Sequence, residues 1–424
     1  MELPIYREWE EDLLKIGVLG RTASDVSFAY DEDYLSWEHA APVSLSLPLR
    51  DQPFDEAELM PYFRGLLPEG LPLESLAASL GLRAEDYFEL LAACGLDCLG
   101  DVIINPRTYY EQRAYEQLSL EEVQAMGESP RKVDDSLEAA HLSLAGTQSK
   151  CGLYHDWSAP DDQEWYQPIG GAPSNTIVKF SRIKMQDLMV VEQLTMACAR
   201  GCGIEAVRTC LINPVLPAIC VERYDRMDAS GQLVSGIDAP LRRHQEDLTQ
   251  AFGLIPSAKY RQLPGGTVQA IADFQRQRAR DPARCLEELC KVLLFNYAIG
   301  NCDGHLKNLS ILYAPDWKSF TLAPAYDLVC TTVYGRFSRE LGMVMGETQD
   351  IDEIGPADIL QMGNHLGLAP RKVRSVAKEI AEVAISALRN EGTTLDDHGF
   401  GTALYRVDEI EEDMLPRLEV LGGV

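Results

Sequence analysis

The chain has 424 residues, 46% of them hydrophobic and 25% charged, so it is long enough for two or three folded domains with a large core. Its net charge of −28 argues against direct binding to nucleic-acid phosphates, and no run of residues approaches the roughly 18 apolar residues of a membrane span. The acidic start MELPIYREWEEDLL is unlike a signal peptide, and the 11 scattered cysteines include no Cys-x-x-Cys pair, so we expect a cytoplasmic protein with mostly buried, apolar cysteines.

The first 105 residues are expected to form a small α+β subdomain. Alternating apolar residues predict short strands, and Gly81 and Gly95 are placed to end two helices. The predicted elements are strands over residues 16–20, 26–30 and 100–105 and helices over residues 73–80 and 84–93. A polar connector over residues 106–135 follows, in which Ser119 and Glu122 form a capping-box pattern before a short helix.

Residues 136–240 are expected to form a β-rich lobe with one helix, and residues 241–424 a mostly helical lobe. The predicted elements of the first lobe are strands over residues 152–154, 176–180, 207–212 and 218–224 and a helix over residues 187–199. Those of the second are helices over residues 245–252, 270–280, 286–299, 356–366 and 370–389, the last stopped by Gly392. The fold class is therefore α+β, with the small N-terminal subdomain followed by two lobes like those of a protein kinase.

The most informative stretch follows the predicted helix over residues 286–299, where residues 301–308 read NCDGHLKN. Asp303 and Asn308 are five positions apart, and Asp327 follows a predicted pair of strands. Phosphoryl transfer from ATP needs one carboxylate near the proton of the substrate hydroxyl, and an Asn and a second Asp to hold magnesium. The spacing equals that of the catalytic loop of protein kinases and predicts a kinase.

Lys179 and a small polar loop are candidates for binding the ATP phosphates. Lys179 lies in an apolar, β-branched strand, either as a phosphate ligand or as an edge lysine that points to solvent; the downstream Asp303 favours the first. Glu192, on the next helix, is either its ion-pair partner or an exposed helix glutamate. The loop SLAGTQSK over residues 143–150 suits backbone N–H contacts to phosphate, although it matches neither a Gly-x-Gly-x-x-Gly nor a Walker pattern.

Three further groups have both a functional and a structural interpretation. The sequence ERY over residues 222–224 either contacts adenine through its backbone or simply ends a strand. His305 either contacts phosphate or holds a tight turn, and Lys307 is placed to neutralise charge on the transferring phosphoryl group. The sequence HQED over residues 244–247 is interpreted as a helix cap and a brace between elements before a catalytic group.

Several separated motifs together resemble the HipA family of serine/threonine kinases, the toxin half of bacterial HipBA-type toxin–antitoxin pairs. The motifs are LPEG (67–70), CGLDCLG (94–100), SLAGTQSK (143–150), VERYDR (221–226), HQED (244–247), GNCDGHLKN (300–308) and YD (326–327). They span most of the chain in the order of the family.

The resemblance implies ATP and Mg²⁺ as cofactors and a role for each matched residue. Asp303 would be the catalytic base, Asn308 and Asp327 the magnesium ligands, and Lys179 the lysine on the ATP phosphates. Ser143 matches the serine that family members autophosphorylate, which ejects the loop and switches off ATP binding. The implied nucleotide-binding residues are Ala145, Gly146, Thr147, Gln148, Ser149, Lys150, Lys179, Glu222, Arg223, Tyr224, His305, Lys307, Asn308, Tyr326 and Asp327.

Two features depart from the family pattern. The family loop commonly has an acidic residue at the position of Ser149 and alanine at that of Thr147, so the autophosphorylated hydroxyl is Ser143, Thr147 or Ser149. The extended N-terminus before the first predicted strand is also unusual.

The resemblance also implies a substrate and a partner. The substrate would be an aminoacyl-tRNA synthetase, typically the glutamyl enzyme, and a helix-turn-helix antitoxin, HipB, would neutralise the kinase and connect it indirectly to DNA. The negative charge suits a basic partner, with a merely solvated surface as the alternative. Two other functions remain: a catalytically silent ATP-binding co-repressor, against which the presence of Lys179 and Asp303 argues, and a kinase for lipids or small molecules.

Overall fold

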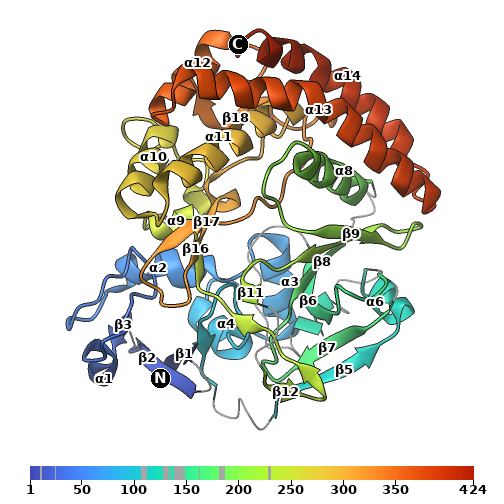
Figure 1. The fold of residues 1–424 in the computed structure, drawn as a ribbon. Helices are drawn as coiled ribbons and strands as arrows, with labels where there is room; N and C mark the ends of the chain where they lie inside the picture. Colours follow the sequence, from blue (N-terminus) through green and yellow to red (C-terminus); the bar gives the residue numbers. More distant parts are fainter. Residues whose placement is uncertain are drawn as a thin grey trace. The chain divides into compact units, whose positions relative to one another are not determined.

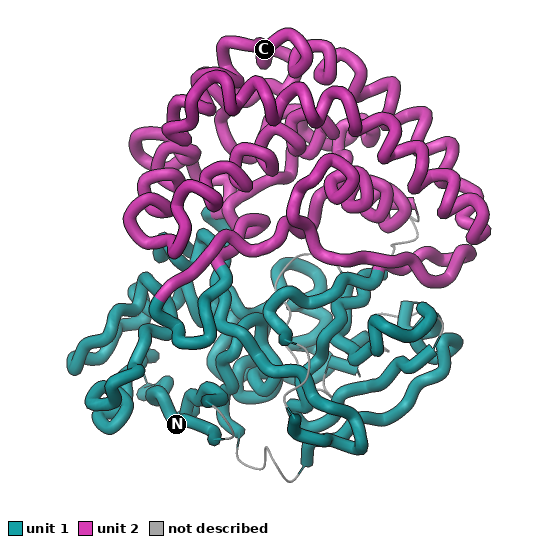
Figure 2. The backbone as a smooth tube through the Cα atoms, in the orientation of Figure 1, with its two compact units in different colours: residues 1–180, 220–258, 312–318 teal, residues 181–219, 259–311, 319–424 magenta. Residues whose placement is uncertain are grey.

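The computed structural model describes residues 1–9, 12–23, 25–106, 112–127, 133–134, 136–137, 149–161, 163–180, 187–227 and 231–424. The chain packs into two compact units, coloured separately in Figure 2. Unit 1 contains Met1–Phe180, Cys220–Ala258 and Leu312–Lys318, and unit 2 contains Ser181–Ile219, Lys259–Ile311 and Ser319–Val424. Each unit is therefore built from segments distant in the sequence. The expected division of the chain at residues 105, 135 and 240 stays a prediction.

A four-stranded antiparallel sheet opens unit 1, in the order β3-β2-β1-β4. Leu3, Ile5, Leu19 and Phe28 contribute to its core and are fully buried. The strands are β1 (Glu2–Trp9), β2 (Asp12–Arg21), β3 (Val26–Tyr30) and β4 (Ile103–Ile104), and the helices are α1 (Glu32–Leu35), α2 (Glu56–Gly65), α3 (Leu71–Ser79) and α4 (Tyr87–Cys94). The N-terminal residues are thus an inner strand of this sheet, where the sequence predicted a segment outside it.

Unit 1 contains five neighbouring strands of a second sheet, in the order β5-β7-β6-β8-β10. Its strands are β5 (Ala114–Leu118), β6 (Lys150–His155), β7 (Trp165–Ile169), β8 (Thr176–Phe180) and β10 (Ala218–Glu222). The capping box predicted at Ser119 is confirmed. The Ser119 hydroxyl accepts from the N–H of Glu122, and the Glu122 carboxylate accepts from the N–H of Ser119. This capping box begins α6 (Leu120–Met126). The remaining elements of unit 1 are β11 (Arg226–Met227), β12 (Leu233–Val234), β13 (Ile237–Asp238), β14 (Leu241–Arg242), β15 (Gln245–Asp247), α9 (Leu248–Ala251) and the 3₁₀ turn Pro256–Ala258.

Unit 2 is mostly helical, as expected for the C-terminal part of the chain. The long helix α13 packs against α8, α11, α12 and α14, and Figure 1 shows α13 and α14 side by side. The helices are α8 (Leu188–Gly201), α10 (Thr267–Arg278), α11 (Pro282–Ile299), α12 (Pro356–His365), α13 (Pro370–Asp397) and α14 (Ala403–Gly422). The strands are β9 (Thr209–Ile212), β17 (Phe320–Leu322), β18 (Glu340–Met345) and β19 (Thr348–Asp350), while β16 (Ser310–Tyr313) begins in unit 2 and ends in unit 1.

Two predicted boundaries are wrong for identifiable reasons. The helix predicted over residues 245–252 is a strand, β15, followed by the short helix α9, which begins where Asp247 caps it. Gly392 does not stop a helix: α13 continues to Asp397. A Cβ atom at Gly392 would lie 2.4 Å from Cγ2 of Val407 on α14, so this glycine allows two helices to pack closely.

The α+β class is confirmed. Among the described residues, no helix has both the length and the apolar character needed to cross a membrane. Nine of the 11 cysteines are buried and all are free thiols, which confirms their expected role as small core residues.

Candidate active site

The loop over residues 301–308, predicted to be catalytic, follows α11, and local chemistry defines both ends of that helix. Asp281 caps the helix by accepting from the N–H of Arg284, and Pro282 takes the first position, where no N–H is needed. Gly300 ends the helix with a left-handed φ of 80°, and a Cβ atom there would lie 2.0 Å from Oγ1 of Thr332. Only glycine fits this turn, so the chain leaves the helix directly into residues 301–308.

Side chains at the base of the loop hold it in one conformation. Asn301 donates from Nδ2 to Oδ1 of Asn296 (3.0 Å) and accepts from the N–H of Asp303 at its own Oδ1 (3.1 Å). Residues Leu306–Asn308 then form a 3₁₀ turn, in which Asn308 N–H donates to His305 O (2.9 Å). These hydrogen bonds define the positions of Asp303 and Asn308 relative to each other.

The structure brings Asn308 together with Asp327, as the predicted metal site requires. Nδ2 of Asn308 donates to Oδ2 of Asp327 at 2.8 Å. Oδ1 of Asn308 is buried and has no hydrogen-bond partner among the described residues. Asp327 has a left-handed φ of 58°, an uncommon conformation that clusters at functional sites. An amide oxygen and a carboxylate are oxygen ligands of the kind Mg²⁺ prefers, so this pair fits that ion.

Asp303 lies beside this pair and has an altered acidity. Partial desolvation raises the pKa of Asp303 above the usual 3.8, and a hydrogen bond from Tyr260 lowers it. The negative charge of Asp327 raises this pKa further, whereas the positive charge of Lys259 lowers it. A carboxylate with a raised pKa accepts a proton more readily near neutral pH.

Tyr260, whose hydroxyl donates to Oδ1 of Asp303, was not predicted from the sequence. Its segment, SAKYRQLPGG, shows no catalytic pattern, so no local signal pointed to it.

The other predicted residues of the loop are buried around it. His305 is 6% exposed, and its ring meets that of Tyr260 edge-on, with centroids 5.0 Å apart. Lys307 is 9% exposed, and its carbonyl accepts from the hydroxyl of Tyr326 at 2.7 Å. That hydroxyl also lies 2.6 Å from Oγ of Ser310. Tyr326 therefore links the loop to the segment that carries Asp327.

In unit 1, the end of the predicted phosphate loop lies directly beside Lys179. Strands β6 and β8 are antiparallel with Lys150 opposite Lys179, and Phe180 N–H donates to Ser149 O at 3.1 Å. Residues opposite each other in an antiparallel pair project from the same face, and two like charges there repel. Two lysines that project from one face of the sheet suit an anionic ligand such as phosphate. Lys179 is 7% exposed, so the interpretation as a lysine that points to solvent is wrong.

The roles predicted for several other candidate residues stay predictions. Ser143, Ala145, Gly146, Thr147 and Gln148 lie outside the described residues. Glu192, on α8, is 1% exposed, so its interpretation as an exposed helix glutamate is wrong; its pairing with Lys179 stays a prediction.

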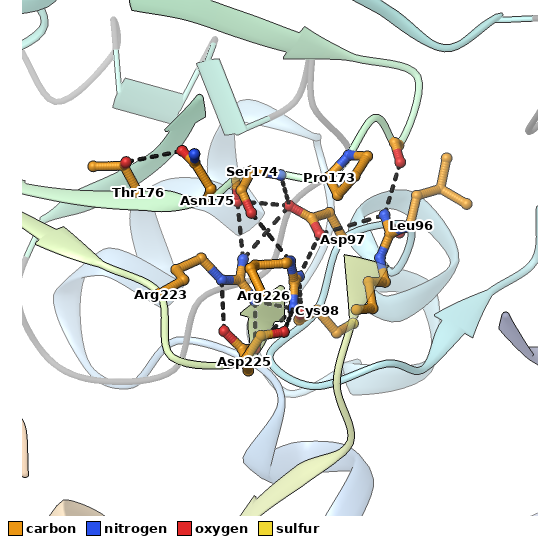
Figure 3. Close-up of polar contacts among 12 residues, drawn as sticks. Leu96, Asp97, Cys98, Pro173, Ser174, Asn175, Thr176, Arg223, Asp225 and Arg226 are labelled. Atoms are coloured by element: carbon orange, nitrogen blue, oxygen red, sulfur yellow. Dashed lines mark hydrogen bonds and ion pairs between the residues drawn. The ribbon is translucent and has the colours of Figure 1, made fainter. Parts of the chain in front are cut away.

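Arg223, predicted to contact adenine, is occupied in a buried ionic network (Figure 3). The guanidinium of Arg223 donates to both carboxylate oxygens of Asp225, at 2.9 and 2.7 Å. The backbone N–H of Arg223 donates to the carbonyl of Asn175 at 2.8 Å. Contact with adenine therefore stays a prediction that depends on the neighbouring Glu222 and Tyr224, both half-buried.

The network joins two of the motifs that the sequence singled out, CGLDCLG and VERYDR. Asp97 accepts from Arg226 at 2.7 Å and lies 3.5 Å from Arg223 and 3.4 Å from Arg242. Burial opposes ionisation of Asp97, but the three arginines outweigh it and hold its pKa below the usual value. The carbonyl of Cys98 accepts from both Arg223 and Arg226. These motifs thus connect the N-terminal part of unit 1 to β10 and the segment after it.

The sequence HQED acts as the predicted cap and brace. Asp247 forms a capping box with Gln250 at the start of α9. His244 lies 2.9 Å from Oδ1 of Asp101 through Nδ1 and 3.0 Å from Arg7 through Nε2. Glu246 accepts from the hydroxyls of Ser44 (2.5 Å) and Tyr313 (2.6 Å), which are far from it in the sequence.

Replacing Glu246 with glutamine is expected to change how the stability of unit 1 depends on pH. Burial raises the pKa of Glu246 from 4.5 to about 7, so the unfolded chain releases this proton first and stability falls as the pH rises between these values. Relative to the variant, wild type should lose on the order of 1–3 kcal/mol of unfolding free energy between pH 5 and pH 8. Urea denaturation followed by tryptophan fluorescence measures this, because all five tryptophans (Trp9, Trp37, Trp157, Trp165 and Trp317) belong to unit 1.

The comparison between variant and wild type cancels the contribution of His244. Burial lowers the pKa of His244 from 6.5 to about 4, so its contribution to stability rises with pH in that window, opposite to that of Glu246. Identical pH dependence in the two proteins would contradict the assignment of the raised pKa to Glu246.

Comparison with known proteins finds similar sequences along most of the chain. The HipA N-terminal domain matches residues 12–105, and the HipA-like C-terminal domain matches residues 142–388, more than half of the chain. The protein named "Putative kinase Y4mE" of Sinorhizobium fredii is 30% identical over 396 residues, covering 86% of this chain and 87% of its own. The serine/threonine-protein kinase toxin HipA of Shewanella oneidensis is 29% identical over 399 residues, 88% of each chain.

A solved structure shares the fold. It is the complex of HipA, HipB and operator DNA of the Shewanella oneidensis MR-1 toxin–antitoxin system, in which the matched chain is 24% identical with a TM-score of 0.77, over 100% of this chain and 99% of that one. Matches to both domains, and relatives along nearly the whole length, show that the chain belongs to the HipA family.

Proposed function

We propose that this protein is an ATP-dependent serine/threonine kinase and the toxin of a toxin–antitoxin pair. The observation that carries the proposal is the contact of Asn308 with Asp327. The buried amide oxygen of Asn308, beside that carboxylate, has no hydrogen-bond partner in the part of the chain that the structure describes. Such an oxygen costs stability unless a ligand uses it, and Mg²⁺ with ATP phosphates would do so. The homologous kinase toxin of Shewanella oneidensis supports the same activity.

Each residue of the site has a part in the reaction. The substrate hydroxyl gives its proton to Asp303 as its oxygen attacks the γ-phosphorus of ATP, and the bond from that phosphorus to ADP breaks. Lys179 and Lys150 bind phosphate oxygens from adjacent strands. Lys307 neutralises charge on the transferring group, and His305 and Tyr326 keep the loop in place.

Asn308 and Asp327 would hold magnesium, which when bound neutralises charge on the phosphates. The described residues contain no cluster of three or more His, Cys, Asp or Glu that suits a metal ion. Mg²⁺ needs no such cluster, because it is usually held by one or two carboxylates together with substrate phosphates and several waters.

The test is transfer of labelled phosphate from γ-labelled ATP with Mg²⁺, to the chain itself and to myelin basic protein, a basic acceptor suited to a chain of net charge −28. Lys179→Gln should lower kcat/KM for ATP by about 10- to 100-fold, because it removes a charge-assisted bond to phosphate. Lys15→Gln, which affects an exposed strand lysine paired with Asp31, is the matched control. Equal rates in both variants would remove Lys179 from the site.

The finer parts of the proposal concern target, self-inhibition and partner. An aminoacyl-tRNA synthetase, of the glutamyl type, is the proposed target, and phosphorylation of Ser143 in the loop the proposed off-switch. Mass spectrometry after incubation with ATP and Mg²⁺ distinguishes Ser143 from Thr147 and Ser149. A HipB-like antitoxin is the proposed partner, supported by the fold shared with HipA of the HipA–HipB–operator complex. Co-purification of this chain with the product of its neighbouring open reading frame tests it, and a helix-turn-helix protein that binds the chain is the expected result.

The alternative is a catalytically silent ATP-binding co-repressor. The presence of Asp303 and Asn308 in one hydrogen-bonded loop, with Asn308 in contact with Asp327, argues against it. Tight ATP binding without phosphate transfer to any acceptor would favour this alternative.

A further inference from the structure

The segment of residues 259–262 in unit 2 is hydrogen-bonded at one end to the loop that carries Asp303 and at the other end to β18 and α10. The carbonyl of Lys259 accepts from Leu306 N–H (3.3 Å), within the 3₁₀ turn after Asp303. Nε2 of Gln262 donates to the carbonyl of Gly342 on β18 (3.3 Å), and its Oε1 accepts from the hydroxyl of Thr267 (2.9 Å). These bonds fix both ends of the segment and define where Tyr260, between them, has to lie.

Tyr260 is 49% exposed, yet its polar end points inward to the catalytic carboxylate. The hydroxyl donates to Oδ1 of Asp303, while the ring meets His305 edge-on at 5.0 Å. An exposed aromatic side chain whose hydroxyl is held in this way has lost conformational freedom for one hydrogen bond. The bond is the same kind that the hydroxyl of a serine or threonine substrate has to make with its general base.

We propose that Tyr260 is a positioning residue that mimics the substrate hydroxyl at Asp303 and is exchanged for it when a protein substrate binds. This inference depends on the proposed kinase function, because it assigns Asp303 as the base. In the absence of substrate the phenol orients the carboxylate. When substrate binds, its hydroxyl replaces the phenol at Asp303, and transfer then proceeds to the substrate oxygen.

The electrostatics agree with this geometry. Desolvation of Asp303 and the nearby charge of Asp327 disfavour its ionised form, whereas Tyr260 and Lys259 favour it. The phenol thus supplies the stabilisation of the carboxylate that the substrate hydroxyl supplies later. Lys259 also lies with Nζ 5.5 Å from the ring centre of Tyr260, so the same short segment carries both groups.

The test compares Tyr260→Phe with Tyr405→Phe, whose hydroxyl likewise bonds a carboxylate, that of Glu409, from an exposed position on α14. With myelin basic protein as acceptor, Tyr260→Phe should lower KM for the acceptor by about 2- to 10-fold, the worth of one displaced hydrogen bond. KM for ATP should not change, and Tyr405→Phe should match wild type. A KM for the acceptor that is unchanged or higher in Tyr260→Phe would overturn the proposal.

A second measurement needs no catalysis and separates this inference from the proposed function. In chain labelled with 3-fluorotyrosine, the ¹⁹F signal that Tyr260→Phe removes should shift when Asp303 is replaced by asparagine, whereas the signal of Tyr405 should not. If wild type transfers no phosphate but the signal shifts, the kinase function fails while the contact stands. If phosphate is transferred but the signal does not shift, the role of Tyr260 fails alone.

Discussion

Asp303→Asn should reduce phosphate transfer by about 10²- to 10⁴-fold, the usual contribution of a general base. The amide has nearly the same shape as the carboxylate but cannot take the proton of the substrate hydroxyl. Initial rates with γ-labelled ATP, for both the chain itself and myelin basic protein, measure the effect. Retention of more than about a tenth of the wild-type rate would exclude Asp303 as the base, since that loss is smaller than any base contributes.

The same substitution should leave the fold intact. The side chain of Asp303 reaches solvent, and its raised pKa shows that its ionised form is disfavoured in the folded state. Removing the charge should therefore leave the melting temperature unchanged or slightly raised, because repulsion from Asp327 is relieved. Asp408→Asn, an exposed position on α14, is the matched control and should change neither rate nor melting temperature. Loss of activity together with a fall in melting temperature would indicate unfolding instead.

Activity should also depend on pH in a defined direction. Asp303 must be ionised to accept a proton, so the rate should fall as the pH drops through its folded pKa, which lies above the ordinary 3.8. This acidic limb belongs to wild type and should be absent from the residual rate of Asp303→Asn.

Asp97→Asn should destabilise unit 1 by about 3–5 kcal/mol, because removing one buried anion leaves part of the buried arginine charge uncompensated. Asp97 is completely buried and is shared by Arg223, Arg226 and Arg242. Its other bonds come from Ser174, whose hydroxyl donates at 2.7 Å and whose N–H donates at 2.9 Å. Urea denaturation followed by tryptophan fluorescence reports this loss selectively, since all five tryptophans are in unit 1.

The control for this prediction is an exposed ion pair of good geometry. Lys15 pairs with Asp31 at 2.7 Å within unit 1, and the two side chains are 41% and 22% exposed. Lys15→Gln should therefore change the stability of unit 1 by about 0–1 kcal/mol, the range for surface pairs in water. A similar small loss in Asp97→Asn would show that the buried network is not the link that holds the parts of unit 1 together.

The free energy of unfolding of wild type should fall at low pH because of the same network. The pKa of Asp225 is held well below its ordinary value, because the charges of Arg223 and Arg226 outweigh the effect of burial. This contribution is complete above the ordinary pKa of aspartate and is lost as the pH falls below it. Protonation of Asp225 should therefore lower the free energy of unfolding of unit 1 in acid. Glu246 opposes this loss, because its protonated form is favoured in the folded state.

Local chemistry in the sequence was enough to locate most elements and the catalytic loop. The cap at Ser119 and the end of α11 at Gly300 depend on residues within a few positions of each other. Asp303 and Asn308 likewise lie within six consecutive residues, the last three of which form a 3₁₀ turn. Hydrogen bonds of this range are determined by neighbouring residue types, so a short stretch of sequence contains their cause.

The sequence by itself determined the fold class, the family motifs and the loop from Asp303 to Asn308, but the tertiary structure decided which residues meet. Gln245–Asp247 form a strand where helical spacing predicted a helix, and Gly392 allows close packing where a stop was predicted. Arg223 belongs to a buried network 125 residues along the chain from Cys98, and Tyr260 reaches Asp303 across 43 residues. Contacts over such separations depend on how the whole chain packs, because no local periodicity or cap records which distant side chain will arrive beside a given residue.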